Sequence, residues 1–203
     1  MTKILKISGK KPNKKKIREA AKVIMSGGVI IFPTETVYGI ACSPFKKKAV
    51  ERIFKLKGRN WNKPLAVIVE NFKQVKTLTK NLSPKAKEIM SRYWPGPLTL
   101  VLNKSSEIPA YVTARLKKVG IRMPDHPISK ELIRTCGIPL VATSANISGS
   151  ADPKTARQAL KQLIDVDLLI DGGRTQVGKA STVIDATGKK VKILRKGPLI
   201  VRV

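Results

Sequence analysis

The stretch Val29-Ile-Ile-Phe32, followed directly by Pro33-Thr-Glu-Thr-Val-Tyr-Gly39, decides the fold of this chain. Four apolar residues in a row predict a buried strand that Pro33 ends. The polar phrase behind the strand carries the hydroxyls of Thr34 and Tyr38. Ligands of α/β proteins bind where such groups follow strand ends. The stretch therefore predicts a sheet with a binding site at one edge, although a polar turn leading to the next helix would fit the phrase alone.

Helical and strand-like segments alternate along the rest of the chain. Ser83-Pro84 predicts an N-cap and the first residue of a helix that extends to about Tyr93. Apolar spacing predicts further helices over 17–25, 49–56, 128–135 and 155–163. Besides 29–32, strands are expected over 65–69, 98–102, 119–123, 139–142, 168–170, 182–184 and 191–194. The last two strands follow one another without a helix, which indicates a mixed sheet. About eight strands and five or six helices favour one α/β domain over 1–203, with a twisted mixed sheet and flanking helices.

Composition excludes several classes of protein. A length of 203 residues suits one well-buried domain. His126 is the only histidine, and Cys42 and Cys136 are the only cysteines, which argues against a zinc site and a disulfide framework. The N-terminus lacks an apolar signal-peptide stretch, and no run approaches the roughly 18 apolar residues of a membrane span. We therefore expect a cytoplasmic protein without a membrane partner or a protein-bound metal.

The net charge is unusual. Lys and Arg number 41 against 13 Asp and Glu, so the formal charge is +28. Such a field attracts polyanions, and it indicates tRNA or double-stranded RNA as a possible partner. A lysine-rich solvated surface explains the same composition equally well. Aromatic residues make up only 4% of the chain, which is too few for a single-strand stacking platform. The lysines are dispersed in runs such as Lys14–Lys16 and Lys46–Lys48.

Cations suited to phosphate lie between a predicted helix and a predicted strand. Lys57-Gly-Arg59 and Lys63 place three positive charges within seven residues. Arginine binds phosphate bidentately, and lysine adds a point charge. A solvated basic loop is the equal alternative. Neither GxxxxGK[ST] nor GxGxxG occurs in the chain, so a P-loop and a Rossmann dinucleotide site are not supported.

One arginine lies within an apolar strand. Arg122 in Gly120-Ile-Arg-Met-Pro124 would be costly to bury unless it is paired. Either Asp125 or a ligand carboxylate could be its partner, and the sequence leaves both open. His126 stands between Asp125 and a proline, which favours a structural hydrogen bond over a role as a base.

Hydroxyl and amide groups follow a later strand in the same way. Ser144 and Asn146 could hold phosphate or ribose, or they could cap a helix. A serine nucleophile is disfavoured because GxSxG is absent. Arg195, at the end of another predicted strand, would point to the same crevice as Ser181-Thr-Val-Ile-Asp185. A site with these groups and no nucleophile–base pair holds and polarises anions.

Six ordered phrases connect these residues. They are PTETVYGI at 33–40, KGRNWNKPL at 57–65, WPGPLTLVL at 94–102, GIRMPDHP at 120–127, ATSANISG at 142–149, and STVID at 181–185 followed by ILRKG at 193–197. Together they resemble the YrdC/Sua5 family, the threonylcarbamoyl-AMP synthases, from about Ile17 to the C-terminus. The resemblance implies a YrdC-like fold with a large, basic, concave cavity.

The family's activity is that of a nucleotidyltransferase. It joins L-threonine, bicarbonate (as CO2) and ATP into L-threonylcarbamoyladenylate and pyrophosphate, for the t6A37 modification of tRNAs reading ANN codons. The resemblance therefore implies ATP, L-threonine, bicarbonate and a downstream threonylcarbamoyl transferase machinery as partners, with Mg2+ bound to the ATP phosphates. Catalysis would be by positioning, through Lys57 and Arg59. Threonine would be bound by Thr34, Tyr38, Arg122 and Ser181. ATP would be bound by Lys57, Arg59, Lys63, Ser144, Asn146 and Arg195.

The chain departs from the family pattern at four positions. These are Asn60, where proline is frequent, Lys63 in place of asparagine, Ile68 near a frequent histidine, and Lys118 in place of threonine. Because the chain stops at Val203, we expect the short, single-domain form. Two other functions stay open at this stage: a basic RNA-binding or ribosome-assembly factor without catalysis, and a related carbamoyl-adenylate-forming enzyme.

Overall fold

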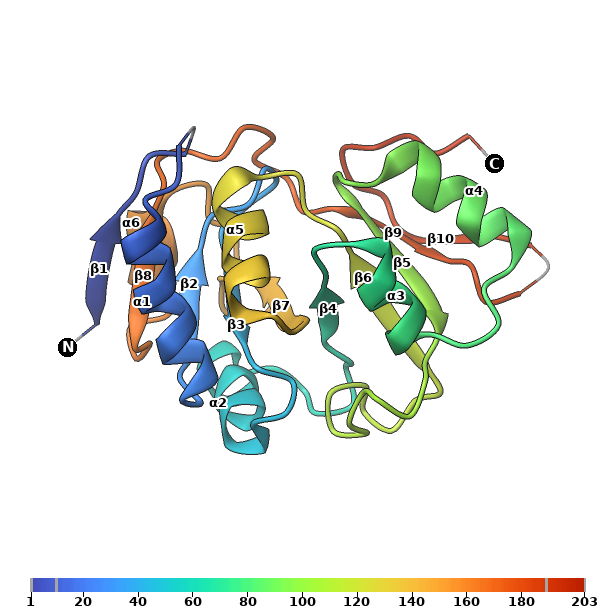
Figure 1. Ribbon diagram of the computed structural model, residues 1–203, viewed down its shortest axis with the longest axis horizontal. Coiled ribbons are helices and arrows are strands. Elements are labelled where there is room, and N and C mark those ends of the chain that lie inside the picture. Colours follow the sequence, from blue (N-terminus) through green and yellow to red (C-terminus); the bar gives the residue numbers. More distant parts are fainter. Residues whose placement is uncertain (1, 10, 189, 203) are drawn as a thin grey trace.

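Ten strands join into one sheet in the computed structural model, which describes residues 2–9, 11–188 and 190–202 (Figure 1). Met1, Lys10, Lys189 and Val203, which the predicted domain includes, lie outside the described residues. The strands are β1 (Lys3–Lys6), β2 (Ile30–Phe32), β3 (Gly39–Cys42), β4 (Ala66–Ile68), β5 (Leu98–Asn103), β6 (Lys118–Arg122), β7 (Leu140–Ser144), β8 (Leu168–Asp171), β9 (Thr182–Asp185) and β10 (Lys192–Arg195). The helices are α1 (Lys14–Met25), α2 (Lys47–Lys57), α3 (Phe72–Leu78), α4 (Pro84–Tyr93), α5 (Pro127–Cys136) and α6 (Ala156–Gln162).

The sheet is mixed, as predicted. Its order is β1-β8-β2-β3-β7-β4-β6-β5-β9-β10. The pairs β1–β8, β2–β8, β4–β6 and β5–β9 are parallel. The pairs β2–β3, β3–β7, β4–β7, β5–β6 and β9–β10 are antiparallel. Apart from β2–β3, β5–β6 and β9–β10, the paired strands are not consecutive in the sequence, so the sheet brings distant segments side by side.

Local signals place the helices. The Ser83 side chain accepts from the backbone N–H of Ala86 at 3.1 Å, and Pro84 begins α4, so this predicted start is confirmed. Gly58 ends α2 in a left-handed conformation with φ 54°, which glycine adopts without strain. His126 is the N-cap of α5, where its Nδ1 accepts from the backbone N–H of Ile128 at 3.2 Å. Its structural role is therefore confirmed.

Three elements were missing from the sequence prediction. Strand β1 is a polar edge strand in which only Leu5 is buried, so its four residues lack a strand-like apolar run. Strand β3 begins at Gly39, a residue typical of turns, yet it pairs with β2 and β7 on its two sides. The seven-residue helix α3 relies on Asn71, whose side chain accepts from the Gln74 N–H.

The two faces of the sheet pack differently. On one face, buried residues pack with α2, α3, α4 and α6. On the other, they pack with α1 and α5, which lie side by side in Figure 1. Beyond α5, this second face carries small residues: Ala142 faces both Ala41 and Ala66 across the strands, and Gly120 adjoins Ala66. The small side chains leave the face hollow there.

Candidate substrate-binding site

A cavity of about 350 Å³ lies over this hollow part of the sheet. Its floor includes Gly39, Ala66, Gly120 and Ala142, contributed by four different strands. A Cβ placed at Gly120 would lie 3.3 Å from Cγ2 of Thr99, so a side chain at position 120 would be in tight contact with Thr99. The polar side chains that line the cavity are Thr34, Thr36, Arg59, Thr99, Arg122, Thr143, Ser144, Ser181 and Arg195.

The turn after β2 is held by its own hydroxyls. Thr34 Oγ1 donates to the Val37 carbonyl at 2.7 Å and accepts from the Thr36 and Val37 N–H groups at 3.2 Å. The backbone N–H groups of Val177 and Gly178 donate to the carbonyls of Glu35 and Thr36 at 2.9 and 2.8 Å. The loop between β8 and β9 therefore fixes this turn from outside, and the turn presents a rigid edge to the cavity.

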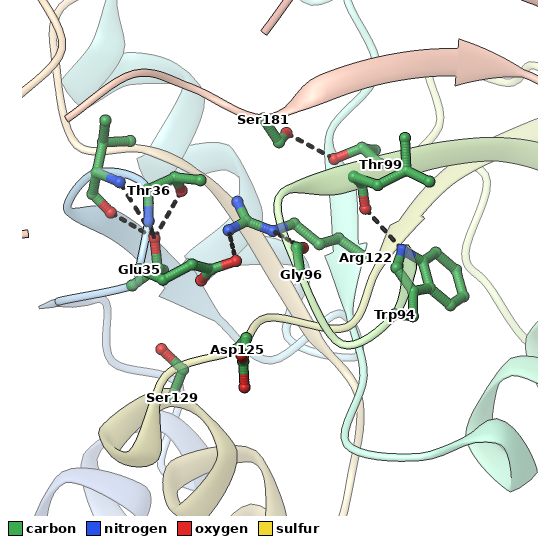
Figure 2. Close-up of polar contacts among 12 residues, drawn as sticks. Glu35, Thr36, Trp94, Gly96, Thr99, Arg122, Asp125, Ser129 and Ser181 are labelled. Atoms are coloured by element: carbon green, nitrogen blue, oxygen red, sulfur yellow. Dashed lines mark hydrogen bonds and ion pairs between the residues drawn. The ribbon is translucent and has the colours of Figure 1, made fainter. Parts of the chain in front are cut away.

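Arg122 has a partner that the sequence analysis did not consider. Its Nη2 donates to Glu35 Oε1 at 2.6 Å, and its Nε donates to the Gly96 carbonyl at 3.2 Å (Figure 2). Asp125 instead accepts from Lys130 at 2.7 Å, so the suggestion of an Asp125 pair is wrong. The sheet brings residue 35 to the end of β6, which proximity along the chain could not indicate.

Ser181 and Arg195 meet at the opposite wall of the cavity. The Ser181 and Thr99 hydroxyls are hydrogen-bonded at 2.9 Å (Figure 2). Arg195 donates to the Ser181 carbonyl from Nε at 3.0 Å and to the Ser181 hydroxyl from Nη2 at 3.2 Å. Burial lowers the pKa of Arg195; the charge of Asp152 opposes this change, and the charge of Arg122 adds to it by a smaller amount. The two guanidinium groups therefore act on the same cavity.

A second pocket of about 340 Å³ adjoins the first through Arg59, Ser144 and Arg195, which line both. Lys57, the last residue of α2, lies in its wall and is only 2% exposed. Lys57 Nζ donates to the Ser144 carbonyl at 2.5 Å and to the Asn146 carbonyl at 2.6 Å. Burial, together with the charge of Arg59, lowers the pKa of Lys57 to about 8, although Asp152 acts in the opposite direction.

The remaining predicted ATP ligands also lie at this second pocket. Arg59 donates to the carbonyls of Lys63 and Pro64, at 3.2 and 2.9 Å, which folds the basic loop back on itself. The Ser144 hydroxyl donates to Asn146 Oδ1 at 2.6 Å. Lys63 is exposed at the rim. The structure therefore brings all six of these residues together around one cation-rich pocket: Lys57, Arg59, Lys63, Ser144, Asn146 and Arg195.

Tyr38 is the one predicted site residue that does not reach either pocket's lining. It is completely buried, and its hydroxyl donates to the Gly173 carbonyl at 2.6 Å and accepts from the Gly172 N–H at 3.1 Å. Burial, with smaller contributions from Asp171, raises the pKa of Tyr38 to about 12. The phenol thus fastens the turn to the β8–β9 loop from behind. Thr34, Arg122 and Ser181 do line the first cavity.

The departures from the family pattern have distinct positions. Ile68 forms part of the wall of the first cavity, and Asn60 lines the second pocket. Lys118 lies away from both linings and pairs with Asp185 at 2.9 Å. Sequence reasoning missed Glu35, although it lies inside the quoted phrase, because a carboxylate in a site for anions carried no obvious role.

The described part of the chain contains neither a cluster of metal-ligating side chains nor a membrane-spanning helix. No group of three or more His, Cys, Asp or Glu side chains that could hold a metal ion occurs among these residues. Within the same ranges, no helix combines the length and apolarity needed to cross a membrane.

The fold and the two joined, cation-lined pockets define an α/β protein whose site suits anionic small molecules, and comparison with known proteins identifies its family. Residues 22–197 match the family model Sua5_yciO_yrdC, whose description reads "Telomere recombination". The chain belongs to this Sua5/YciO/YrdC family.

Two curated relatives are identical to the chain at more than a third of the aligned positions. The threonylcarbamoyl-AMP synthase of Pyrococcus abyssi is 43% identical over 91% of this chain and 54% of that protein. The putative threonylcarbamoyl-AMP synthase of Methanocaldococcus jannaschii is 36% identical over 96% of this chain and 93% of that protein. The first of these shows that the chain spans about half the length of some relatives it matches.

Among solved structures, that of P. abyssi Sua5 complexed with L-threonine superposes with a TM-score of 0.94 and 41% identity. The superposition covers 98% of this chain and 58% of the other. The predicted YrdC-like fold and family are thereby confirmed.

Proposed function

We propose that the chain is an L-threonylcarbamoyladenylate synthase, which forms threonylcarbamoyl-AMP and pyrophosphate from L-threonine, bicarbonate and ATP. One observation carries the proposal: the cavity lined by Arg122 and Ser181 adjoins a second, cation-rich pocket of about 340 Å³, and Arg59, Ser144 and Arg195 line both. The names of the relatives, and the threonine complex of P. abyssi Sua5, support the choice of amino acid and product.

Threonine would occupy the first cavity. Its carboxylate suits Arg122, because a guanidinium and a carboxylate form paired, charge-assisted hydrogen bonds. The hydroxyl of Ser181 and the turn at Thr34 would approach the polar side of the substrate. The floor of small residues offers apolar contact for its methyl group. This division of polar and apolar contacts orients the amine toward the second pocket.

ATP would place its phosphates in the second pocket. Bicarbonate takes up a proton and loses water to give CO2. The threonine amine attacks CO2, losing a proton, and forms a carbamate. A carbamate oxygen then attacks the α-phosphorus, the bond to the β-phosphate oxygen breaks, and pyrophosphate leaves with its electron pair. Lys57, Arg59 and Arg195 would stabilise the charge on the α-phosphate and on the departing pyrophosphate. No covalent nucleophile is needed, since the chain acts by positioning and charge.

Magnesium fits this scheme as an ion carried by the nucleotide. Mg2+ is usually bound by substrate phosphates with only one or two protein carboxylates. Asp152 supplies a carboxylate in the lining of the second pocket, which agrees with that donor set. When bound, Mg2+ would neutralise part of the phosphate charge.

The wider setting of the activity is also proposed. The product would serve the t6A37 modification of tRNAs reading ANN codons through a downstream transferase machinery, in the cytoplasm. The formal charge of +28 favours contact with tRNA or double-stranded RNA as well. RNA binding without catalysis is the second candidate function. It would not require Lys57, Arg59, Ser144 and Asn146 to meet in one pocket.

Pyrophosphate release from ATP tests the proposal. The assay compares each of the 20 amino acids, with and without bicarbonate. We expect release to require L-threonine and bicarbonate together, with serine about 10- to 200-fold less effective because it lacks one methyl group. Activity that is equal with serine, or indifferent to bicarbonate, would contradict the proposal.

Arg59→Ala should lower the rate of pyrophosphate release far more than it lowers the thermal stability. A variant that unfolds as it loses activity would indicate a structural role for Arg59.

A further inference from the structure

We propose that Glu35 is a positioning residue that holds the Arg122 guanidinium for the substrate carboxylate; this inference rests on the proposed function. Both side chains are nearly buried, with Glu35 only 4% and Arg122 9% exposed. Burying either charge alone would be strongly unfavourable, whereas the 2.6 Å ion pair compensates both. The pair therefore has to form whenever the site is folded.

Two contacts fix the plane of the guanidinium. Nη2 donates to Glu35 Oε1, and Nε donates to the Gly96 carbonyl. The group is planar, so two anchored nitrogens leave it no freedom to rotate. Nη1 has no hydrogen-bond partner within the described ranges, and Arg122 lines the cavity while Glu35 does not. The free edge of Arg122 is thus available to a ligand, and Glu35 acts from the side away from it.

Glu35 is itself held in place. Its carbonyl accepts from Val177 N–H at 2.9 Å, and the Thr34 hydroxyl ties the residues on either side of it into one turn. Figure 2 shows Glu35 beside Thr36 and directed at Arg122 across the gap between the two segments. A residue anchored at its backbone and bonded through its tip can set the position of its partner to the accuracy that substrate orientation requires.

The carboxylate also reduces repulsion between cations. Arg122 and Arg195 both line the 350 Å³ cavity, and the charge of Arg122 adds a small part to the lowering of the Arg195 pKa that burial mainly causes. A negative charge on the outer side of Arg122 offsets this repulsion without occupying the cavity. Glu35 Oε2 is buried without a hydrogen-bond partner in the described structure. An amide oxygen could accept the same hydrogen bond as Oε1, so Glu35→Gln separates the contribution of the charge from that of the hydrogen bond.

The test measures KM for threonine and for ATP separately in pyrophosphate release, with calorimetric titration of L-threonine as a second readout. Glu35→Ala removes both charge and contact, and we expect the KM for threonine to rise about 10- to 100-fold, with the KM for ATP changed less than about threefold. Glu35→Gln keeps an acceptor but not the charge, and it should restore much of the loss, leaving the KM for threonine about three- to tenfold above wild type.

Two controls make the result specific. Asp125→Ala removes a nearby, exposed carboxylate whose ion-pair partner among the described residues is Lys130, and it should leave both KM values unchanged. In an Arg122→Ala background, Glu35→Gln should have no further effect on threonine, since the two residues act as a unit. Thermal melting shows whether each variant is folded, and Glu35→Gln decides the question if Glu35→Ala does not fold.

The possible failures are distinguishable. A folded Glu35→Gln enzyme with wild-type KM for threonine, or an equal rise in the KM for ATP, would overturn the positioning role. Wild-type protein without threonine-dependent pyrophosphate release would instead overturn the proposed function.

Discussion

Lys57 should give the proposed synthase activity an alkaline limb in its pH profile. Its pKa is lowered to about 8, mainly by burial and secondly by Arg59. Only about one tenth of a lysine with that pKa is charged at pH 9, compared with more than about 95% of an ordinary lysine. If the charged form binds ATP, kcat/KM for ATP falls about tenfold between pH 7 and pH 9, because this ratio reports the ionisation of enzyme that has not yet bound ATP.

The assay is pyrophosphate release at limiting ATP and saturating threonine and bicarbonate, from pH 6.5 to 9.5. Lys57→Arg is the matched variant, because arginine keeps its charge over this range. It should flatten the alkaline limb even where its overall rate is lower. A wild-type profile without a fall between pH 7 and 9, or an unchanged limb in Lys57→Arg, would refute the assignment of this ionisation to Lys57.

Three further predictions concern the cavity, the N-cap of α5 and the surface charge. Gly120→Val should fill the floor of the first cavity and raise the KM for threonine more than tenfold, whereas Gly120→Ala should have a smaller effect. A KM for threonine in Gly120→Val equal to that of the wild type would show that threonine binds elsewhere. Burial lowers the pKa of His126 below 6.5 in the folded state, so the contribution of neutral His126 to stability is present above pH 6.5 and is lost on acidification. The fall in melting temperature from pH 7.5 to 5.5 should therefore be smaller in His126→Asn, which keeps an N-cap residue, than in the wild type. An identical fall in the two proteins would contradict this. The third variant changes six dispersed lysines to Gln: Lys14, Lys15, Lys16, Lys46, Lys47 and Lys48. Pyrophosphate release should stay nearly intact, while the salt dependence of RNA binding should flatten by about 0.7–0.9 in log–log slope for each lost phosphate contact. Loss of activity in the folded variant would mean that these lysines serve catalysis.

The strand-and-helix pattern could be predicted where local signals are strong. Apolar runs located eight strands, and the cap at Ser83 located the start of α4. Strand β1 could not be found in this way, because its pairing with β8 is set by residues about 165 positions away, as in Lys3 and Leu168. The same limit applies to strand β3, which depends on two partners for its hydrogen bonds.

The candidate site shows the same division between local and distant information. Residue types and phrases indicated the cations of the second pocket, and the structure brings these residues together. They could not indicate that Arg122 pairs with Glu35, which is 87 positions away, in place of Asp125. Nor could they show that Tyr38 turns its hydroxyl to Gly173. Side-chain direction depends on neighbours that only the complete sheet supplies.

The strand order has a consequence for how the protein becomes functional during synthesis. Strand β8 separates β1 from β2, and β9 and β10 complete the edge that carries Ser181 and Arg195. A growing chain therefore exposes an unfinished sheet until β8, β9 and β10 have emerged, and a ligand can contact both walls of the first cavity only afterwards. Substrate binding would thus report the end of folding, and ligands that bind across the two walls would stabilise newly made protein against proteolysis.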